Sequence, residues 1–445
     1  MVGGAIRDAA MGRTCHDYDF VVDGDVRSVS KDLANVLSGN YYVLDDERNT
    51  TRIIIYTGQG NRVILDFAAP RADDIDTDLR LRDLTIDAIA VDMNKPLKII
   101  DPLNGMTDIK NKIVRACYEK AFADDPIRIL RAIRVATNLG FKIEHNTLSW
   151  IKSSVNLIPN TSPERVRDEL FRMLDNSKAA SMLRLLKAID GLKVVFSMDG
   201  DGLSEINQWN TKFTKIEILH KIFSILIGKL NTESADNLLY GSIVLHLGQF
   251  RWSLEKHFST HINSERSLKS LIAFSALVSL QQESEVAIDA TAKKFVLSND
   301  EYKRLNDIRI GFGLINHWIE LQQEPNNLDI YRYFKKTGPA GIDSCFVAIA
   351  HTLALSEGFS ANNAWEHLIL ICKKIMHAWW KDHSKVVSPP KVINGDILQE
   401  QFNLDEGKAI GNVLELIREA QVCGQVNNIE EALIYAQEIL ARGRK

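Results

Sequence analysis

The stretch that decides the fold is Val2-Gly3-Gly4-Ala5-Ile6-Arg7-Asp8, followed a few residues later by His16-Asp17-Tyr18-Asp19-Phe20-Val21-Val22. The first part predicts a glycine turn before a short helix, where backbone N–H groups can face a triphosphate while Arg7 supplies further donors. In the second part, the alternation of side chains along a strand places Asp17 and Asp19 on the same side. Two such carboxylates can share magnesium ions, the arrangement used for two-metal phosphoryl transfer. Either part alone is weak, since Gly-Gly occurs in simple turns and an Asp-x-Asp pair is usually a surface feature.

The residues around this stretch have the composition of a small α+β head. Short runs rich in Val, Ile and Tyr, bounded by Gly, Asn or Asp, predict strands. A helix is expected at 26–37, and the head should extend over residues 1–115. The expected strands are 18–22, 41–46, 51–57, 61–67 and 85–93.

From about residue 116 onward the pattern becomes helical. Leu, Ile and Phe recur three and four residues apart in segments such as 127–139, 163–175 and 179–195. Ser-Pro-Pro at 388–390 is the clearest linker. We therefore expect an α+β head followed by an all-α array, divided into a neck, a body and a tail at 116–190, 191–387 and 391–445.

The bulk composition excludes several classes of protein. A net charge of -4, from 54 basic and 58 acidic residues, argues against a uniformly basic coat, so any RNA must bind to a local patch. The five cysteines are scattered without a CxxC pair, which indicates free thiols rather than a zinc site. No apolar run has the length of about 20 residues that a membrane span needs, and no signal segment is recognisable. A cytoplasmic location is expected.

Three later segments strengthen the prediction. They are Leu81 to Ala88, a turn at Asp101 to Gly105, and the helix opening at Asp124 to Arg134. Within the last, Arg128, Arg131 and Arg134 follow one ridge of an otherwise apolar helix, which indicates that they line a cleft. Asp125 has two interpretations, a functional carboxylate or the N-cap of this helix.

Asp66 lies in the apolar run Val63-Ile64-Leu65-Asp66-Phe67 and also has two interpretations. It is either a third carboxylate near the metal ions or a carboxylate satisfied by backbone donors at a strand end. The residues alone leave both open.

Taken together, these segments resemble the class II tRNA nucleotidyltransferases, the CCA-adding enzymes, and the related bacterial poly(A) polymerases. The family's motifs run GGxVRD with a following DxD, RRDFTxNA, DPxxG, EDxxRxxRAxRFA and ERVxxEL. This chain supplies Gly3 to Asp8 with Asp17 and Asp19, Arg82 to Ala88, Asp101 to Gly105, Asp124 to Arg134, and Glu164 to Leu170. The resemblance implies a head like that of DNA polymerase beta.

The resemblance also implies roles for individual residues. Asp17 and Asp19 would be the catalytic ligands of Mg²⁺, and Gly3, Gly4, Arg7 and Arg82 would surround the nucleotide. Asp125 and Arg128 would act as a protein template for the base edge of cytosine or adenine, because a carboxylate accepts from an exocyclic amine while a guanidinium donates. Arg131 and Arg134 would hold that template and the phosphates. The implied substrates are CTP, ATP and the 3′ end of tRNA, which the tail would grip by shape and phosphate contact.

The chain departs from the family's pattern at several points. Leu81 and Asp87 stand where the family has Arg and Asn, and the flexible loop of the family looks shortened at 67–81. Relatives that add only two cytidines resemble this, so addition of CC alone is a live alternative to CCA. The family usually has a helix and strand before the Gly-Gly, so we expect a truncated start and an open sheet edge beside the site. Some relatives carry an HD phosphohydrolase domain, yet the only His-Asp dipeptide is His16-Asp17, so a degenerate HD-like body is expected.

Two further interpretations remain open. A poly(A) polymerase of the same family would share every catalytic motif, so the sequence does not separate it from a tRNA nucleotidyltransferase. A catalytically inactive RNA-binding protein is the interpretation from a different class, motivated by the missing N-terminal strand.

Overall fold

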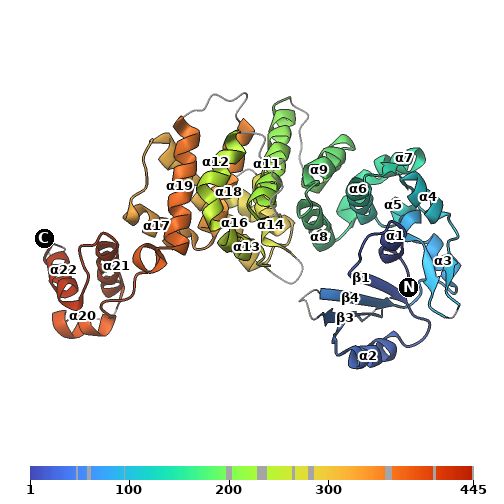
Figure 1. Ribbon diagram of the computed structural model, residues 1–445, viewed down its shortest axis with the longest axis horizontal. Helices are drawn as coiled ribbons and strands as arrows, with labels where there is room; N and C mark the ends of the chain where they lie inside the picture. The colour runs from blue at the N-terminus through green and yellow to red at the C-terminus, as the bar shows by residue number, and fades with distance from the viewer. Residues whose placement is uncertain are drawn as a thin grey trace. The chain divides into compact units, whose positions relative to one another are not determined.

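The computed structural model describes residues 1–46, 49–57, 62–94, 96–196, 203–227, 238–262, 266–278, 285–355, 363–403 and 407–442. The chain divides into two compact units, Met1–Gly200 and Asp201–Lys445. In Figure 1 the first unit runs from blue to green and the second from green to red. The expected division into four parts is finer than this, and it stays a prediction.

The first unit is built on a four-stranded sheet in the order β1-β4-β3-β2. The strands are β1 (Asp17–Val21), β2 (Asn40–Asp45), β3 (Thr50–Tyr56) and β4 (Arg62–Ala68), each close to its predicted range. β1 is parallel to β4, and the other neighbours are antiparallel. Val2 forms isolated bridges to Asp19 and Ala90, so the chain start lies along β1.

One face of this sheet is closed by α2 (Val26–Leu37), which has the predicted bounds (Figure 1). Its buried residues Val26 and Ala34 pack on Ile53 and Phe67. Phe20 and Phe67 stack with their ring centroids 5.0 Å apart. Because side chains alternate along a strand, Asp19 and Asp66 lie on the opposite face, and that face opens into the site.

The prediction of a strand at 85–93 is wrong in its first half. Residues Thr85–Asp87 form a buried 3-10 turn, η1, and only β5 (Ala90–Asp92) is a strand, paired with β6 (Lys98–Ile100). The reason is a set of contacts distant in sequence. The hydroxyl of Thr85 donates to Asp108 at 2.7 Å, and its N–H donates to the carbonyl of Arg115 at 2.9 Å.

Helices make up most of the remainder of the first unit. α6 (Ile127–Leu139) matches its prediction, and α8 (Pro163–Leu174) ends one residue early. The helix expected at 179–195 is interrupted at Asp190, which has a positive φ. The other elements are α1 (Gly4–Ala10), α3 (Ile75–Arg80), α4 (Gly105–Asn111), α5 (Ala121–Asp124), α7 (His145–Ser154), η2 (Val155–Asn160), α9 (Ala179–Ala188), α10 (Gly191–Phe196), and the parallel pair β7 (Ile113–Val114) and β8 (Lys142–Ile143).

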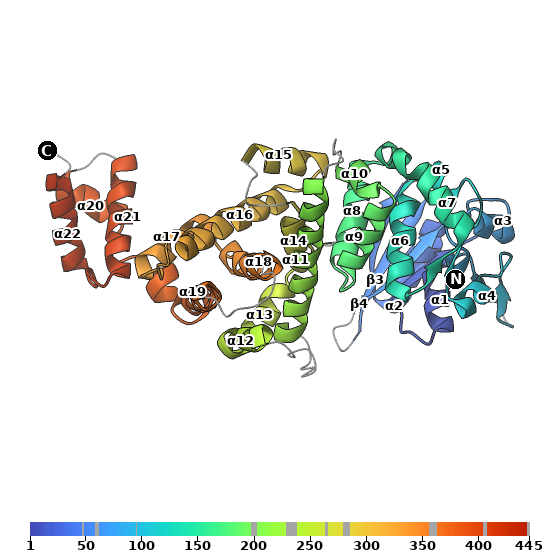
Figure 2. The same ribbon diagram turned by 90° about the horizontal axis from the view of Figure 1, so that it is seen from above.

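The described part of the second unit is helical, as predicted. α18 (Ala340–Leu355) lies at its centre, buried along most of its length and packed on α11 (Leu203–Ile227) and α16 (Asn299–Glu320) (Figure 2). The other helical elements are α12 (Leu238–Leu247), η4 (Gly248–Phe250), α13 (Arg251–Phe258), α14 (Leu268–Val278), α15 (Glu285–Lys294), α17 (Asn327–Thr337), α19 (Asn363–Trp380), and the π-helical turn η5 (His383–Val387).

The last three helices form a small bundle with a core of their own. They are α20 (Gly395–Phe402), α21 (Lys408–Val422) and α22 (Ile429–Arg442), and residues such as Leu398, Ile417 and Ala432 are buried between them. Over the ranges that the structure describes, none of the helices is both long and apolar enough to span a membrane by itself. Within these ranges, only α17 and α18 taken together, which are bent relative to each other, reach the length and apolar composition of a membrane span.

Candidate active site

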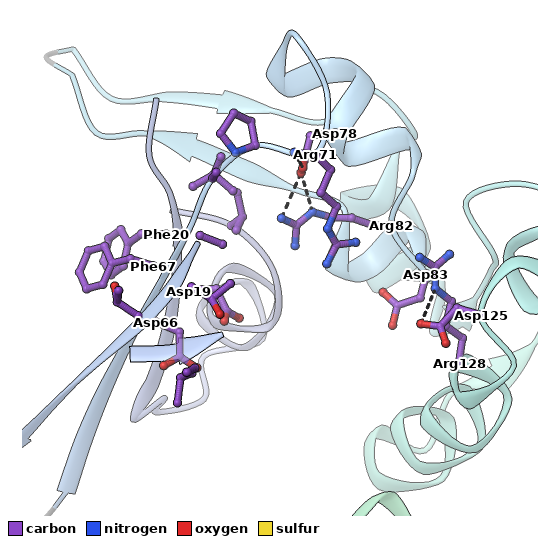
Figure 3. Close-up of a pocket in the computed structure, with 18 of the residues that line it drawn as sticks. Asp19, Phe20, Asp66, Phe67, Arg71, Asp78, Arg82, Asp83, Asp125 and Arg128 are labelled. Carbon is purple, nitrogen blue, oxygen red and sulfur yellow. Dashed lines mark hydrogen bonds and ion pairs between the residues drawn. The ribbon is translucent and has the colours of Figure 1, made fainter. Parts of the chain in front are cut away.

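A cavity of about 730 Å³ opens beside the sheet. This volume is in the range typical of small-molecule sites. Its walls come from all four strands of the sheet, the segment 69–83 and the start of α6, with one residue from α8, as the close-up in Figure 3 shows in part. The charged lining consists of Asp19, Asp66, Asp78, Asp83, Asp125, Arg71, Arg82, Arg128, Arg131 and Arg165.

Two carboxylates face the cavity from neighbouring strands. The β1–β4 register pairs Asp19 with Asp66 (Figure 3). Burial against the sheet raises the pKa of Asp19, and the nearby charge of Asp66 adds to the effect. The guanidinium of Arg52 in β3 forms a bidentate pair with Asp66, in which Nε donates to Oδ1 at 2.8 Å and Nη2 to Oδ2 at 2.9 Å. Asp66 is therefore satisfied by a guanidinium and not by the backbone donors that one interpretation expected.

Asp17 lies two residues before Asp19 on β1, exposed, and among the described residues it does not line the cavity. A search of the described chain finds no group of three or more His, Cys, Asp or Glu side chains arranged to hold a metal. Mg²⁺ is usually held by one or two carboxylates together with substrate phosphates. Asp19 and Asp66 fit this ion, because their oxygens are hard donors and a cation between them would relieve their mutual repulsion.

The glycine turn contributes space next to the carboxylate of Asp19. Gly3 has a φ of 81°, and its N–H donates to the carbonyl of Ile89 at 3.2 Å, so this N–H is already occupied, while the expectation that Gly4 lies beside a triphosphate stays a prediction. A Cβ on Gly3 would lie 3.2 Å from Oδ2 of Asp19 and 3.8 Å from Nη1 of Arg82. Gly4 follows as the first residue of α1. The absence of a side chain therefore brings Asp19 and Arg82 next to the turn.

Arg7, expected beside the nucleotide, is engaged elsewhere. Its Nη1 atom donates to Asp87 at 2.6 Å and its Nε atom to Asp8 at 2.9 Å, and it is not among the described residues that line the cavity. Burial raises the pKa of Asp87, and the Arg7 charge opposes this rise. Asp87, which stands at the family's Asn position, is thus paired with Arg7.

Arg82 faces the cavity with its orientation fixed. Its Nε atom donates to Oδ2 of Asp78 at 3.1 Å, and Asp78 is fully buried. Both residues are labelled in Figure 3, where this contact is dashed. Arg82, one of the four residues expected around the nucleotide, thus lines the cavity with a fixed guanidinium group.

The arginine ridge of α6 divides between two tasks. Arg128 and Arg131 line the cavity, and Arg131 pairs with Asp83 at 2.8 Å. Burial opposes ionisation of Asp83, but Arg131 and Arg128 outweigh it and lower the pKa. Arg134 instead forms an ion pair with Glu169 of α8, outside the described lining. The ridge was expected to line a cleft along its whole length, and the structure confirms this for Arg128 and Arg131 only.

Asp125 does not cap α6. The helix begins after Pro126 without a side-chain cap, and both Asp125 oxygens accept from Arg165 of α8, at 3.0 and 2.9 Å. Arg128 approaches Asp125 at 3.7 Å and donates to the carbonyl of Leu81 at 3.3 Å. The functional interpretation of Asp125 is therefore favoured over the capping one.

Sequence reasoning missed several charged residues of the cavity. Asp83 and Arg165 lie inside the quoted motifs. Their spacing in the sequence did not indicate that Asp83 would pair with Arg131 and Arg165 with Asp125. Asp78 could have been suspected from its i,i+4 spacing to Arg82. Arg71 carried no recognisable signal.

Two family models match the chain. "Poly A polymerase head domain" covers residues 1–115, and "Probable RNA and SrmB- binding site of polymerase A" covers residues 140–198. The cavity draws on both segments, since Asp19 lies in the first and Arg165 in the second.

Relatives carry related names. The chain is 37% identical over 198 residues to a CC-adding tRNA nucleotidyltransferase of Geobacter sulfurreducens, covering 44% of this chain and 45% of that relative. It is 25% identical over 465 residues to an A-adding tRNA nucleotidyltransferase of Deinococcus radiodurans, covering 98% and 94%. The aligned part thus spans less than half of the first relative.

A solved structure shows the same fold over nearly the whole chain. The complex of a CCA-adding enzyme with CTP has a TM-score of 0.62 and 22% identity, covering 100% of this chain and 91% of that one. The head like that of DNA polymerase beta and the helical array behind it are thereby confirmed. With its acidic pair and its arginine-lined cavity, the chain is similar to poly(A) polymerases and tRNA nucleotidyltransferases over the segments that both family models match.

Proposed function

We propose that this chain is a Mg²⁺-dependent, template-independent RNA nucleotidyltransferase that extends the 3′ end of tRNA from CTP, and from ATP if it completes CCA. The observation that carries the proposal is the pair Asp19 and Asp66, which faces an arginine-lined cavity large enough for a nucleotide. The two relatives named above are tRNA nucleotidyltransferases that add CC and A, respectively, which supports the substrate class.

The reaction is the attack of the RNA 3′ oxygen on the α-phosphorus of the nucleotide, with loss of pyrophosphate. Bound magnesium would help to ionise that hydroxyl and neutralise the triphosphate. Asp17 and Asp19 would hold it, and Asp66 is a further carboxylate, opposite Asp19 in the β1–β4 register. Arg82, oriented by Asp78, donates to phosphate oxygens. Gly3 keeps the approach to Asp19 open, because any Cβ there would crowd Oδ2 of Asp19.

Base selection falls to Asp125 and Arg128. A carboxylate has about four acceptor sites, so Asp125 can hold Arg165 and still accept from an exocyclic amine of cytosine or adenine. Guanine and uracil do not present that pattern. The short segment 67–81 folds back as α3 and leaves little chain for a long flexible loop. This favours addition of CC over complete CCA.

The RNA would bind along the helical part of the chain. Residues 140–198, which match the RNA-binding family model, include α7 to α10. The tail bundle of α20 to α22 is the further surface expected from the sequence. Binding by shape and phosphate contact should weaken as salt rises. The division into head, neck, body and tail and the cytoplasmic location stay predictions.

The experiment supplies a tRNA lacking CCA, Mg²⁺ and each labelled triphosphate, and the product ladder is resolved. We expect two CMP additions, with AMP added only if the enzyme completes CCA. Asp19→Asn should abolish incorporation while tRNA binding is retained. Asp32→Asn, an exposed carboxylate on α2, is the matched control and should behave as wild type.

Two outcomes would overturn the proposal. A long adenylate ladder without any cytidine would identify a poly(A) polymerase. Absence of incorporation by the wild-type chain in every condition, with RNA binding intact, would identify an inactive RNA-binding protein.

A further inference from the structure

One cation of the cavity has no acidic partner within hydrogen-bond or ion-pair distance among the described residues. The other lining arginines each approach a carboxylate: Arg82 with Asp78, Arg131 with Asp83, and Arg128 and Arg165 with Asp125. For Arg71, three residues after the end of β4, the part of the chain that the structure describes offers no side-chain hydrogen bond or ion pair. Arg71 is therefore the lining arginine whose donors remain available to a ligand.

The surroundings of Arg71 disfavour its charge. Burial lowers the pKa of Arg71, and the nearby guanidinium groups of Arg82 and Arg128 lower it further, while Asp78 and Asp83 act in the opposite direction. Three guanidinium groups gathered in one cavity repel one another unless an anion lies between them. A multiply charged anion would relieve this repulsion and accept hydrogen bonds from Arg71 and Arg82.

A single buried carboxylate sets the position of both groups. Oδ1 of Asp78 accepts from the backbone N–H of Arg71 at 2.9 Å, while Oδ2 accepts from Nε of Arg82 at 3.1 Å. Figure 3 shows Arg71 and Arg82 reaching the same part of the cavity from this common anchor. Because Asp78 has no exposed surface, it cannot itself meet a ligand, and its effect passes through the two arginines.

We propose that Arg71 is an additional ligand of the nucleotide's triphosphate, acting beside Arg82, and that Asp78 is the residue that positions both. The triphosphate is favoured over an RNA phosphate because Arg82 adjoins Gly3 and Asp19, where the reacting phosphate must lie. This inference rests on the proposed function, and it adds a phosphate-binding arm, residues 70–82, to the site. It assigns the short segment 67–81 a role in holding phosphate, beyond any effect of its length on base choice.

The test compares binding of CTP with binding of cytidine to the full chain by calorimetry, in Mg²⁺ and without tRNA, so that no transfer occurs. Arg71→Met should weaken CTP binding at least about tenfold, the scale of a lost charge-assisted hydrogen bond, and leave cytidine binding unchanged. Arg71→Lys should recover part of the loss. Arg80→Met is the matched control, because Arg80 is exposed on α3, pairs with Asp76 and lies outside the lining.

Asp78→Asn tests the positioning role. The amide keeps an oxygen for the Arg71 N–H but replaces the charge that holds Arg82. We expect weaker CTP binding with cytidine binding retained, and a KM for CTP that rises more than kcat falls. Equal weakening of both ligands would instead show a general structural role, and it would overturn the assignment of Asp78.

Two results would overturn the assignment of Arg71. One is an Arg71→Met variant that binds CTP as wild type does. The other is a variant whose KM rises for tRNA but not for CTP, which would place Arg71 on the RNA. Either leaves the proposed function intact as long as the wild-type chain incorporates CMP, whereas a wild-type chain that incorporates nothing overturns the function itself.

Discussion

Asp125 shows how a residue expected to read a base is prepared for it. Its two oxygens accept from Arg165, which is 40 residues away in the sequence and lies on another helix. A bidentate pair fixes the plane of a carboxylate as well as its position. The free acceptor sites of Asp125 therefore point in a fixed direction before any nucleotide enters.

Arg165→Gln should allow the Asp125 carboxylate to rotate while hardly changing the stability of the fold. The Arg165 side chain is 47% exposed, and exposed ion pairs contribute about 1 kcal/mol or less. We expect kcat/KM for CTP to fall about 10- to 100-fold, on the scale of a misplaced binding group, while the unfolding temperature barely changes. Steady-state kinetics and a thermal melt measure the two quantities.

Arg172→Gln serves as the matched control for this prediction. Arg172 lies on the same helix, is more exposed, and pairs with Glu169 away from the cavity. If both variants lose the same activity, or if Arg165→Gln melts far below wild type, orientation of Asp125 is not what Arg165 provides.

At the scale of elements, the site depends on a close approach between α4 and η1. Gly105, the first residue of α4, lies so near that a Cβ would be 2.1 Å from the carbonyl oxygen of Thr85. The carboxylate of Asp101 accepts from the N–H groups of Gly105 and Met106, at 2.7 and 2.9 Å, and so starts the helix. This contact holds η1, which directly follows Asp83 of the cavity lining and contains Asp87, the partner of Arg7.

Gly105→Ala should therefore destabilise the first unit. Overpacking against backbone costs about 1–3 kcal/mol, and each kcal/mol lowers the unfolding temperature by about 2–4 °C for a unit of this size. Differential scanning calorimetry measures the change. Gly411→Ala in α21 is the control, because no atom lies within 4 Å of its Cβ position and alanine is the better helix former. A Gly105→Ala variant as stable as wild type would contradict the close approach.

The elements that the sequence predicts best are those whose signals are local. α2 and α6 have the expected bounds because their apolar spacing is helical throughout. Thr85 to Asp87 reads as a strand, yet it forms a turn because its partners, Asp108 and Arg115, are distant in sequence. Among site residues, the motifs located Asp19, Arg82 and Asp125. The sequence did not reveal that Arg7 pairs with Asp87, because the two residues are 80 positions apart in the sequence.

At the scale of the molecule, the tail bundle meets the body through charged contacts. Arg332 of α17 binds Glu419 of α21 with both ends, at 2.7 and 2.6 Å. Lys335 pairs with Glu415, and the hydroxyl of Tyr331 donates to the same carboxylate at 2.9 Å. Burial and this carboxylate raise the pKa of Tyr331 to about 12. The contact is polar and partly exposed, so it should be weak and sensitive to salt.

Reversal of one charge should therefore release the bundle, and reversal of both should restore it. Glu419→Arg alone places cations opposite each other, so we expect faster cleavage near the 388–390 linker in limited proteolysis and faster hydrogen exchange in α21. Arg332→Glu combined with Glu419→Arg should return both rates toward those of wild type. At about 1 M salt, where the Debye length is about 3 Å, the single variant and wild type should become alike. Identical cleavage of all variants at low salt would exclude a role for this pair.

The pair of Asp125 and Arg165 also has a consequence for fidelity. The acidic residues of β1 belong to the sheet, whereas Asp125 has its orientation only while α8 is packed on α6. Regions of a protein open locally at lower free energy than the whole unfolds. Local opening of α8 would therefore free Asp125 while leaving Asp19 and Asp66 in the sheet. Under the proposed function, such opening would let nucleotide transfer continue while the choice among nucleotides became less strict.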